Sequence, residues 1–164
     1  MSVTREEIHV RQVECRGYKR SDALWDIEGT LLDRKTYALD LGDRGRLAPH
    51  DPIHRMMLRL TIDRDMVIRA VEATMDRTPY AICPGAVGIM QTLVGLQIGA
   101  GWLAEVRKRL PQDGRCTHLF ELLPPLATAA WQTLGSERPQ PADNPAKIGT
   151  CYAYATERLA LRQR

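Results

Sequence analysis

Aromatic side chains and cysteines are both scarce in this sequence. Only 5% of its 164 residues are aromatic, with a single phenylalanine, so a folded core must be mainly aliphatic. The four cysteines include no CxxC pair and are too few for a disulfide-rich secreted scaffold. Because the first residues also lack an apolar signal region, we expect a cytoplasmic protein whose thiols are free or bound to a ligand.

A strong charge of one sign is also missing. Lysine and arginine total 23, and aspartate and glutamate total 20. The resulting net charge of +3 is too small to predict a nucleic-acid partner. Residues 78–104 carry no charge and are numerous enough to cross a bilayer. That stretch contains five glycines, two prolines and two glutamines, so we expect a buried segment and no membrane partner.

The remaining composition is that of one ordinary globular domain. Hydrophobic residues make up 44% of the chain and charged residues 26%. A chain of this length can bury a core without disulfides or metals. We therefore expect a single domain over residues 1–164.

The first half of the chain predicts an antiparallel meander of four strands over about residues 8–76. Apolar and polar residues alternate along 23–32 and 53–63, as in strands with one buried face. Residues 10–18 and 66–75 supply the other two strands, and a loop rich in Gly, Asp and Pro covers 40–52. Consecutive strands joined by short turns favour antiparallel pairing.

The second half predicts helices over about residues 84–134. Apolar residues recur at helical spacing over 86–110, and the glycines of 95–101 indicate a joint between two helices. A further helix begins near Thr117, whose hydroxyl can cap it, and Pro124 with Pro125 should kink or restart it. A Pro-rich linker (135–149) and an amphipathic helix (152–164) follow. Strands followed by helices indicate an α+β fold, with the helices on one sheet face.

The sharpest local feature is Cys116 followed closely by His118. A helix N-terminus stabilises a thiolate, and the histidine can act as its base or as a metal ligand. A small buried cysteine and a surface histidine would give the same pattern. With Cys83, which lies at the junction between strand and helix, these residues could bind zinc or iron, and Asp63 could be a fourth ligand.

A second candidate site lies on the polar face of the predicted sheet. Asp26 and Glu28 share that face, and paired carboxylates can divide acid and base roles when their surroundings differ. A solvated face balanced by arginines is the alternative interpretation. His54 begins its strand and could pair with Asp63. The candidate substrate-binding residues are Arg16, Arg59 and Trp25.

The glycines of 95–101 do not predict a phosphate-binding loop. Their order is GxxxGxG rather than GxGxxG, and no strand precedes them as in a dinucleotide-binding unit. We therefore expect no nucleotide cofactor.

Several motifs resemble the DUF2889 family of bacterial proteins of unknown function. They are RGYKRSDALWDIE (16–28), DRK (33–35), PIH (52–54), RLTID (59–63), GLQIGAGW (95–102) and CTHLFELL (116–123). Two positions depart from the family pattern: Ala23 replaces a usual glycine and Arg55 a common acidic residue. The resemblance implies no reaction, but it implies a small cytoplasmic protein, in some members linked with catabolism of aromatic or steroid-like compounds.

A more distant resemblance is to iron–sulfur scaffold proteins of the NifU and SufE type. It consists in the order of a strand meander, Cys83, a helix, and Cys116 at the start of another helix. It implies a metal-binding or cluster-scaffold role, although no third cysteine lies between these two.

The leading functional hypothesis is a small enzyme acting on a carboxylated or CoA-linked small-molecule substrate by acid–base or Cys/His chemistry. Its candidate catalytic residues are Glu28, His54, Asp63, Cys116 and His118. A metal-binding protein using Cys83, Cys116 and His118, with zinc or iron, is the first alternative, and a non-catalytic binding module is the second. A homo-oligomer is compatible with an apolar face around Trp102 or Trp131.

Overall fold

The computed structural model describes residues 2–135, 137–138 and 147–158. The chain divides into two compact units, residues 1–134 and 135–164, and each is described by itself. The first unit has an α+β fold, as the sequence predicts.

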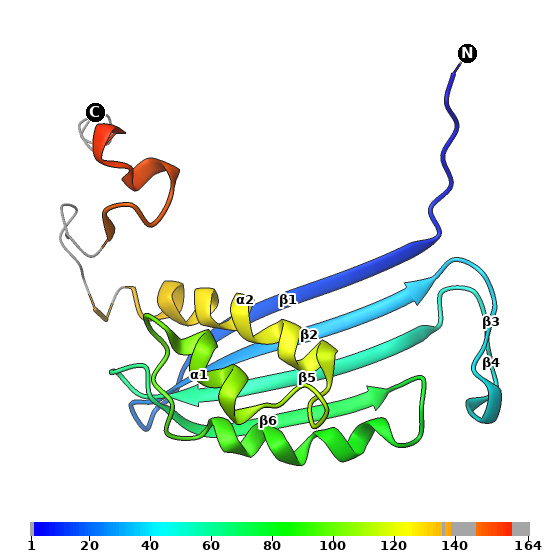
Figure 1. Ribbon diagram of the computed structural model, residues 1–164, viewed down its shortest axis with the longest axis horizontal. Coiled ribbons are helices and arrows are strands. Elements are labelled where there is room, and N and C mark those ends of the chain that lie inside the picture. The colour runs from blue at the N-terminus through cyan, green and yellow to red at the C-terminus, as the bar shows by residue number, and fades with distance from the viewer. Residues whose placement is uncertain (1, 136, 139–146, 159–164) are drawn as a thin grey trace. The chain divides into compact units, whose positions relative to one another are not determined.

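Four long strands form one antiparallel sheet in the first unit (Figure 1). The strands are β1 (His9–Lys19), β2 (Trp25–Lys35), β5 (Pro52–Ile62) and β6 (Ile68–Arg77), and their order in the sheet is β1-β2-β5-β6. Each strand pairs with the next long strand along the chain, so the predicted meander is confirmed.

The predicted loop between β2 and β5 contains short elements of its own. Strands β3 (Leu39–Asp40) and β4 (Arg46–Leu47) pair with each other, and the 3-10 helix η1 (Gly42–Arg44) joins them. This hairpin lies at the end of the sheet where β2 ends and β5 begins (Figure 1).

The alternation in β2 and β5 divides the sheet into a buried face and a polar face. On the buried face Trp25 lies opposite Ile62, and Ile27 lies opposite Leu60. On the other face the carboxylates of Glu28 and Glu72 bind the guanidinium of Arg59 between them, each at 2.8 Å. The sequence pattern therefore predicted correctly which side chains enter the core.

The first of the two predicted helices is instead a pair of 3-10 helices, η2 (Cys83–Ala86) and η3 (Gly88–Leu93). Pro84 and two glycines lie in or beside these turns, and residues of this kind weaken an α-helix. The Gln91 side-chain amide donates a hydrogen bond to the Val71 carbonyl, 2.6 Å away, which ties η3 to β6.

The predicted glycine joint is an extended segment that pairs with the start of β6. The Gly95 N–H donates to the Ile68 carbonyl at 2.8 Å, and the Ile68 N–H donates to the Leu96 carbonyl at 2.8 Å. Gly95 has φ +86°, a conformation that favours glycine. Helix α1 (Trp102–Arg109) follows and packs near η3.

Helix α2 (Thr117–Thr133) covers the buried face of β1, β2 and β5 (Figure 1). It runs without a break through Pro124 and Pro125, so the expected restart there is wrong. Thr117 is not its cap, because Cys116 is the N-cap residue and no side chain caps the helix. Two glycines allow the helix to approach closely: a Cβ on Gly17 would overlap the Thr133 side chain, and one on Gly29 would lie 3.1 Å from Leu126.

The second unit is described only in part. Tyr152–Tyr154 form the 3-10 helix η5, and residues 156–158 form a similar turn, where the sequence predicts an α-helix over 152–164. Residues 159–164 of that predicted helix, and 136 and 139–146 of the predicted linker, lie outside the described residues. Within the described part of the chain, every helix is too short or too polar to span a membrane.

Candidate functional site

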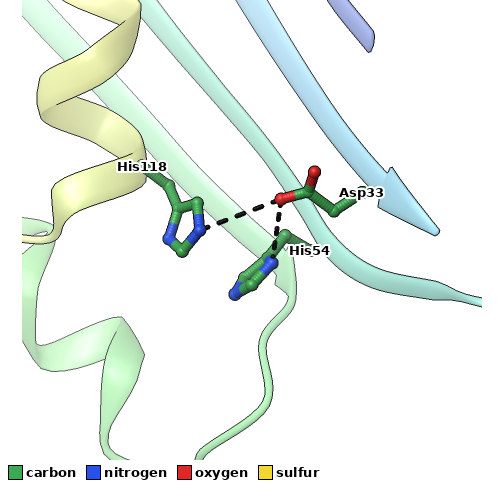
Figure 2. A group of neighbouring side chains, drawn as sticks. All are labelled: Asp33, His54 and His118. Carbon is green, nitrogen blue, oxygen red and sulfur yellow. Dashed lines mark hydrogen bonds and ion pairs between the residues drawn. The ribbon is translucent and has the colours of Figure 1, made fainter. Parts of the chain in front are cut away.

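A carboxylate and two imidazoles meet at the end of the sheet. Asp33 lies near the end of β2 and His54 near the start of β5, and the two residues are register partners. His118 reaches them from the first turn of α2 (Figure 2). The antiparallel pairing and the helix that crosses it therefore bring three distant segments together.

The Asp33 carboxylate is buried, with 2% of the residue exposed, and has several hydrogen-bond donors around it. Arg11 donates to both of its oxygens, through Nε and one terminal nitrogen, each at 2.8 Å. His9 Nε2 lies 3.1 Å from Oδ1. Burial by itself would raise the pKa of Asp33, but the hydrogen bonds and charge of Arg11, together with the His9 hydrogen bond and the charge of His54, lower that pKa below its ordinary value. The carboxylate is therefore ionised at neutral pH.

The two imidazoles approach the same carboxylate oxygen, as Figure 2 shows. His54 Nδ1 lies 3.1 Å from Asp33 Oδ2, and His118 Nε2 lies 3.8 Å from it. The ring centroids of the two histidines are 3.8 Å apart. Burial lowers the pKa of both histidines. The charge of His118 lowers the pKa of His54 further, and the charge of Arg11 lowers the pKa of His118 further. The negative charge of Asp33 opposes this lowering in both rings. Both rings are therefore largely neutral at neutral pH.

The ionised carboxylate decides which nitrogen of His54 carries the proton. A carboxylate only accepts hydrogen bonds, so the His54 nitrogen facing Asp33, Nδ1, is the donor. In the neutral ring Nε2 is then unprotonated and can accept a proton or bind a metal. This is the arrangement in which a carboxylate orients a catalytic or metal-binding imidazole from behind.

A thiol completes the group. Cys116 Sγ lies 3.9 Å from His118 Nδ1, while the opposite nitrogen of that ring faces Asp33. Proton exchange between a cysteine and a neighbouring histidine is the usual way in which a protein thiol becomes a nucleophile. Cys116, His118 and Asp33 thus form a chain of thiol, imidazole and carboxylate.

This group opens into a cavity of about 460 Å³. His54, Cys83, Cys116 and His118 all line it, so four of the predicted site residues share one cavity. Tyr80 and Ile82 also line it and are 64% and 84% exposed, which gives it an apolar rim. The cavity therefore joins polar chemistry to a surface that suits an apolar ligand.

Asp33, His54 and His118 also meet the geometric requirement for a metal site. One ligand atom from each lies within 4.8 Å of the other two. Two histidines and a carboxylate are ligands that zinc and iron accept. An ion there would compete with Arg11, which already binds both Asp33 oxygens.

The other predicted site residues lie elsewhere. His54 lies near the start of β5, and Asp63 comes directly after its end. At the rise of an extended strand the two residues are about 30 Å apart, so the expected pair of His54 with Asp63 is wrong. Its carboxylate binds the backbone N–H groups of Asp65 and Val67 and the Arg69 side chain.

Four further candidates also lie outside the cavity. Glu28 and Arg59 bind each other on the polar sheet face, and Arg16 binds Glu14 at 2.7 Å. Trp25 is buried in the core, as is Trp102. The balanced, solvated face that was the alternative interpretation describes Glu28 and Arg59 well.

Asp33, Arg11 and His9 are site residues that the sequence reasoning missed. A signal for Asp33 was present, because it continues the alternation of Trp25, Ile27 and Leu31 and so places a carboxylate on the buried face. A charged side chain in such a position is rarely buried without a partner. Nothing local in the sequence indicates that Arg11 and His9 are the partners.

Residues 9–132 match a protein family described as "Protein of unknown function (DUF2889)". The chain belongs to the DUF2889 family. The matched part of this DUF2889 protein contains the whole four-stranded sheet and every residue around Asp33 described above. No curated protein and no solved structure matches the chain.

Proposed function

We propose that this DUF2889 protein is an enzyme that acts on a small molecule by Cys/His chemistry, assisted by acid–base catalysis from His54. The observation that carries the proposal is the buried Asp33 carboxylate, which lies 3.1 Å from His54 Nδ1 and 3.8 Å from His118 Nε2, behind two histidines that line a cavity. A structural ion pair alone would not need two neutral imidazoles and a thiol on the cavity wall.

The groups suit a thiol nucleophile. His118 Nδ1, 3.9 Å from Cys116 Sγ, accepts the thiol proton, and the Asp33 carboxylate stabilises the imidazolium that forms. The thiolate then attacks an electrophilic carbon such as a carbonyl, forming an S–C bond while the carbonyl π pair moves to oxygen. The oxyanion pair then re-forms the carbonyl while the bond to the leaving group breaks, and the His118 imidazolium gives its proton to that group. His54, oriented by Asp33 and unprotonated at Nε2, accepts a proton from the water that cleaves the resulting thioester.

The substrate that fits is a molecule with an apolar part and a reactive carbonyl. Tyr80, Ile82 and Met56 supply apolar contacts, and the cavity wall also carries one positive group, Arg115, and one acidic group, Asp113. A carboxylated or CoA-linked intermediate has this combination of features. We extend the proposal to a cytoplasmic catabolic role, in keeping with four free cysteines.

The test is the alkylation rate of each cysteine, measured with iodoacetamide and peptide mapping by mass spectrometry. Cys116 should react at least about 10-fold faster at neutral pH than Cys151, which is exposed but has no histidine contact among the described residues. His118→Gln should remove most of that advantage. Equal rates at Cys116 and Cys151, or no effect of His118→Gln, would exclude the thiol step.

A metal centre is the second candidate, because Asp33, His54 and His118 offer ligand atoms within 4.8 Å of one another and Cys83 and Cys116 line the same cavity. The likeness to iron–sulfur scaffold proteins belongs to this candidate. Metal analysis of freshly purified protein tests it. Near-stoichiometric zinc or iron that is lost in His54→Gln would support a metal centre; substoichiometric metal in both proteins would exclude it.

A further inference from the structure

A second pocket, of about 340 Å³, lies beside the β3–β4 hairpin. It lies among the hairpin, the start of β5 and the residues at and after the end of β6, and its lining residues are Leu41, Arg44, Leu47, Pro52, Arg77 and Thr78. Two of these six side chains are arginines from separate elements, η1 and β6. The pocket therefore collects positive charge from two parts of the chain.

Arg77 has another arginine beside it. Arg55 of β5 is its register partner across the β5–β6 ladder. Like charges directly opposite each other destabilise an antiparallel pair, so this arrangement costs free energy unless an anion compensates it. A bulge at this point leaves Asp76 without a register partner in β5.

Among the side chains that the structure describes, which do not include that of Asp43, no acidic group neutralises these arginines. Arg44, Arg55, Arg77 and Asp76 make no ion pair with any of those described side chains. Two acidic groups of the hairpin region bind its backbone instead: Asp40 accepts a hydrogen bond from the Gly42 N–H at 2.8 Å, and Asp51 accepts one from the Ala48 N–H at 2.9 Å. By contrast, Arg11, Arg59 and Arg69 all bind carboxylates.

We propose that Arg44 and Arg77, with Arg55 beside them, bind a doubly charged oxyanion, either free phosphate or a phosphate ester. The planar guanidinium donates two parallel hydrogen bonds to phosphate oxygens, which is why arginine recurs at phosphate sites. The two positive charges that line the pocket, Arg44 and Arg77, match a dianion better than a single carboxylate. Such a ligand would relieve the repulsion between Arg55 and Arg77.

The position of the pocket connects it to the proposed function. Pro52 precedes His54 by two residues, and Thr78 adjoins Pro79, which lines the His54 cavity. If one ligand occupies both pockets, the substrate of the proposed enzyme carries a phosphate group. This last step rests on the proposed function, whereas anion binding itself does not.

Calorimetric titration of the full chain with inorganic phosphate, at constant ionic strength, tests the site. We expect saturable binding of one phosphate, weakened at least about 10-fold by Arg44→Gln and by Arg77→Gln. Arg16→Gln is the matched control, because Arg16 is an exposed arginine already paired with Glu14, and it should leave the affinity unchanged. Circular dichroism verifies that each variant is folded.

The Tm of Arg55→Gln, measured with and without phosphate, gives a second test. If Arg55 were merely structural, its substitution would not change the effect of phosphate on the Tm. Without phosphate this variant should have a higher Tm than the native chain, and phosphate should raise its Tm less. Absence of saturable phosphate binding, an equal loss in Arg16→Gln, or equally tight binding of acetate would overturn the proposal. His54→Gln should bind phosphate normally, so failure of the Cys/His proposal and failure of this site are distinguishable.

Discussion

Asp33 is the residue on which the candidate site depends. It occupies a position of β2 that faces the core, and its carboxylate contacts side chains from β1, β5 and α2. A buried charge of this kind is tolerated only when partners replace its lost hydration. Arg11 supplies the opposite charge, and in turn binds Glu121 of α2 at 2.6 Å.

Asp33→Asn should destabilise the protein. The substitution removes the negative charge and leaves Arg11 with a neutral partner, so we expect a loss of about 2 kcal/mol in the free energy of unfolding. Urea unfolding followed by circular dichroism measures it. Glu28→Gln, which breaks an ion pair on the polar sheet face, is the control and should cost less than about 1 kcal/mol. Equal losses in the two variants would contradict a central role for Asp33.

The two histidines should make stability depend on pH. Their pKa values are lowered in the folded protein, so near their ordinary value of 6.5 the unfolded chain binds more protons. The free energy of unfolding should therefore fall as the pH drops from about 7.5 to about 5.5. Asp33 affects stability in a separate pH range. Its contribution to the free energy of unfolding is fully present above its ordinary pKa of 3.8, and it is lost below that value as the pH falls through the lowered pKa of the folded protein.

Urea unfolding at the two pH values checks the contribution of the histidines. The free energy of unfolding of His118→Gln should fall less on acidification than that of the native chain. This variant lacks one of the two histidines that bind a proton more readily in the unfolded chain. A native stability that stays constant or rises on acidification would be inconsistent with two neutral, half-buried imidazoles.

At the scale of elements, the turn between β1 and β2 has a conformational cost. Ala23 has φ +62°, in the left-handed region that favours glycine. Left-handed backbone costs an L-residue about 1 kcal/mol or more, because its Cβ crowds the carbonyl oxygen. The sequence alone could indicate the turn but not the sign of φ.

Ala23→Gly should therefore stabilise the protein by about 0.5–1 kcal/mol, since Ala23 is exposed and little burial is lost. Ala70→Gly is the matched control: this alanine is exposed within β6, where glycine should destabilise by about 0.5–1 kcal/mol. The Tm of each variant against the native chain measures both effects. The same direction of change in the two variants would refute the argument from φ.

The strands and the helices differ in how far local sequence predicted them. Alternation along β2 and β5 is a property of neighbouring residues, and it gave both the strands and their buried faces. The apolar spacing before Gly95 is equally periodic, yet it forms 3-10 turns, because Pro84 and the glycines weaken an α-helix and contacts with β6 hold the segment. Periodicity identifies the buried face but does not distinguish between types of helix.

At the scale of the whole molecule, the described core lies entirely within residues 25–134. The family match, residues 9–132, covers nearly the same part of the chain. We therefore expect a chain ending at Leu134 to fold by itself, with a Tm within about 5 °C of the full chain and a single cooperative transition. Calorimetry measures this, and a truncated chain that is unfolded or lacks cooperativity would mean that residues 135–164 are needed for the fold.

The sequence by itself determined the α+β class, the four-stranded meander, the buried faces of its strands and the cysteine and histidine candidates. These follow from spacing between near neighbours, which sequence records directly. Only the tertiary structure decided that His54 pairs with Asp33 rather than Asp63, and that His118 and Cys116 join them. Those contacts depend on strand register and on where α2 crosses the sheet, and residues far apart in the chain set both.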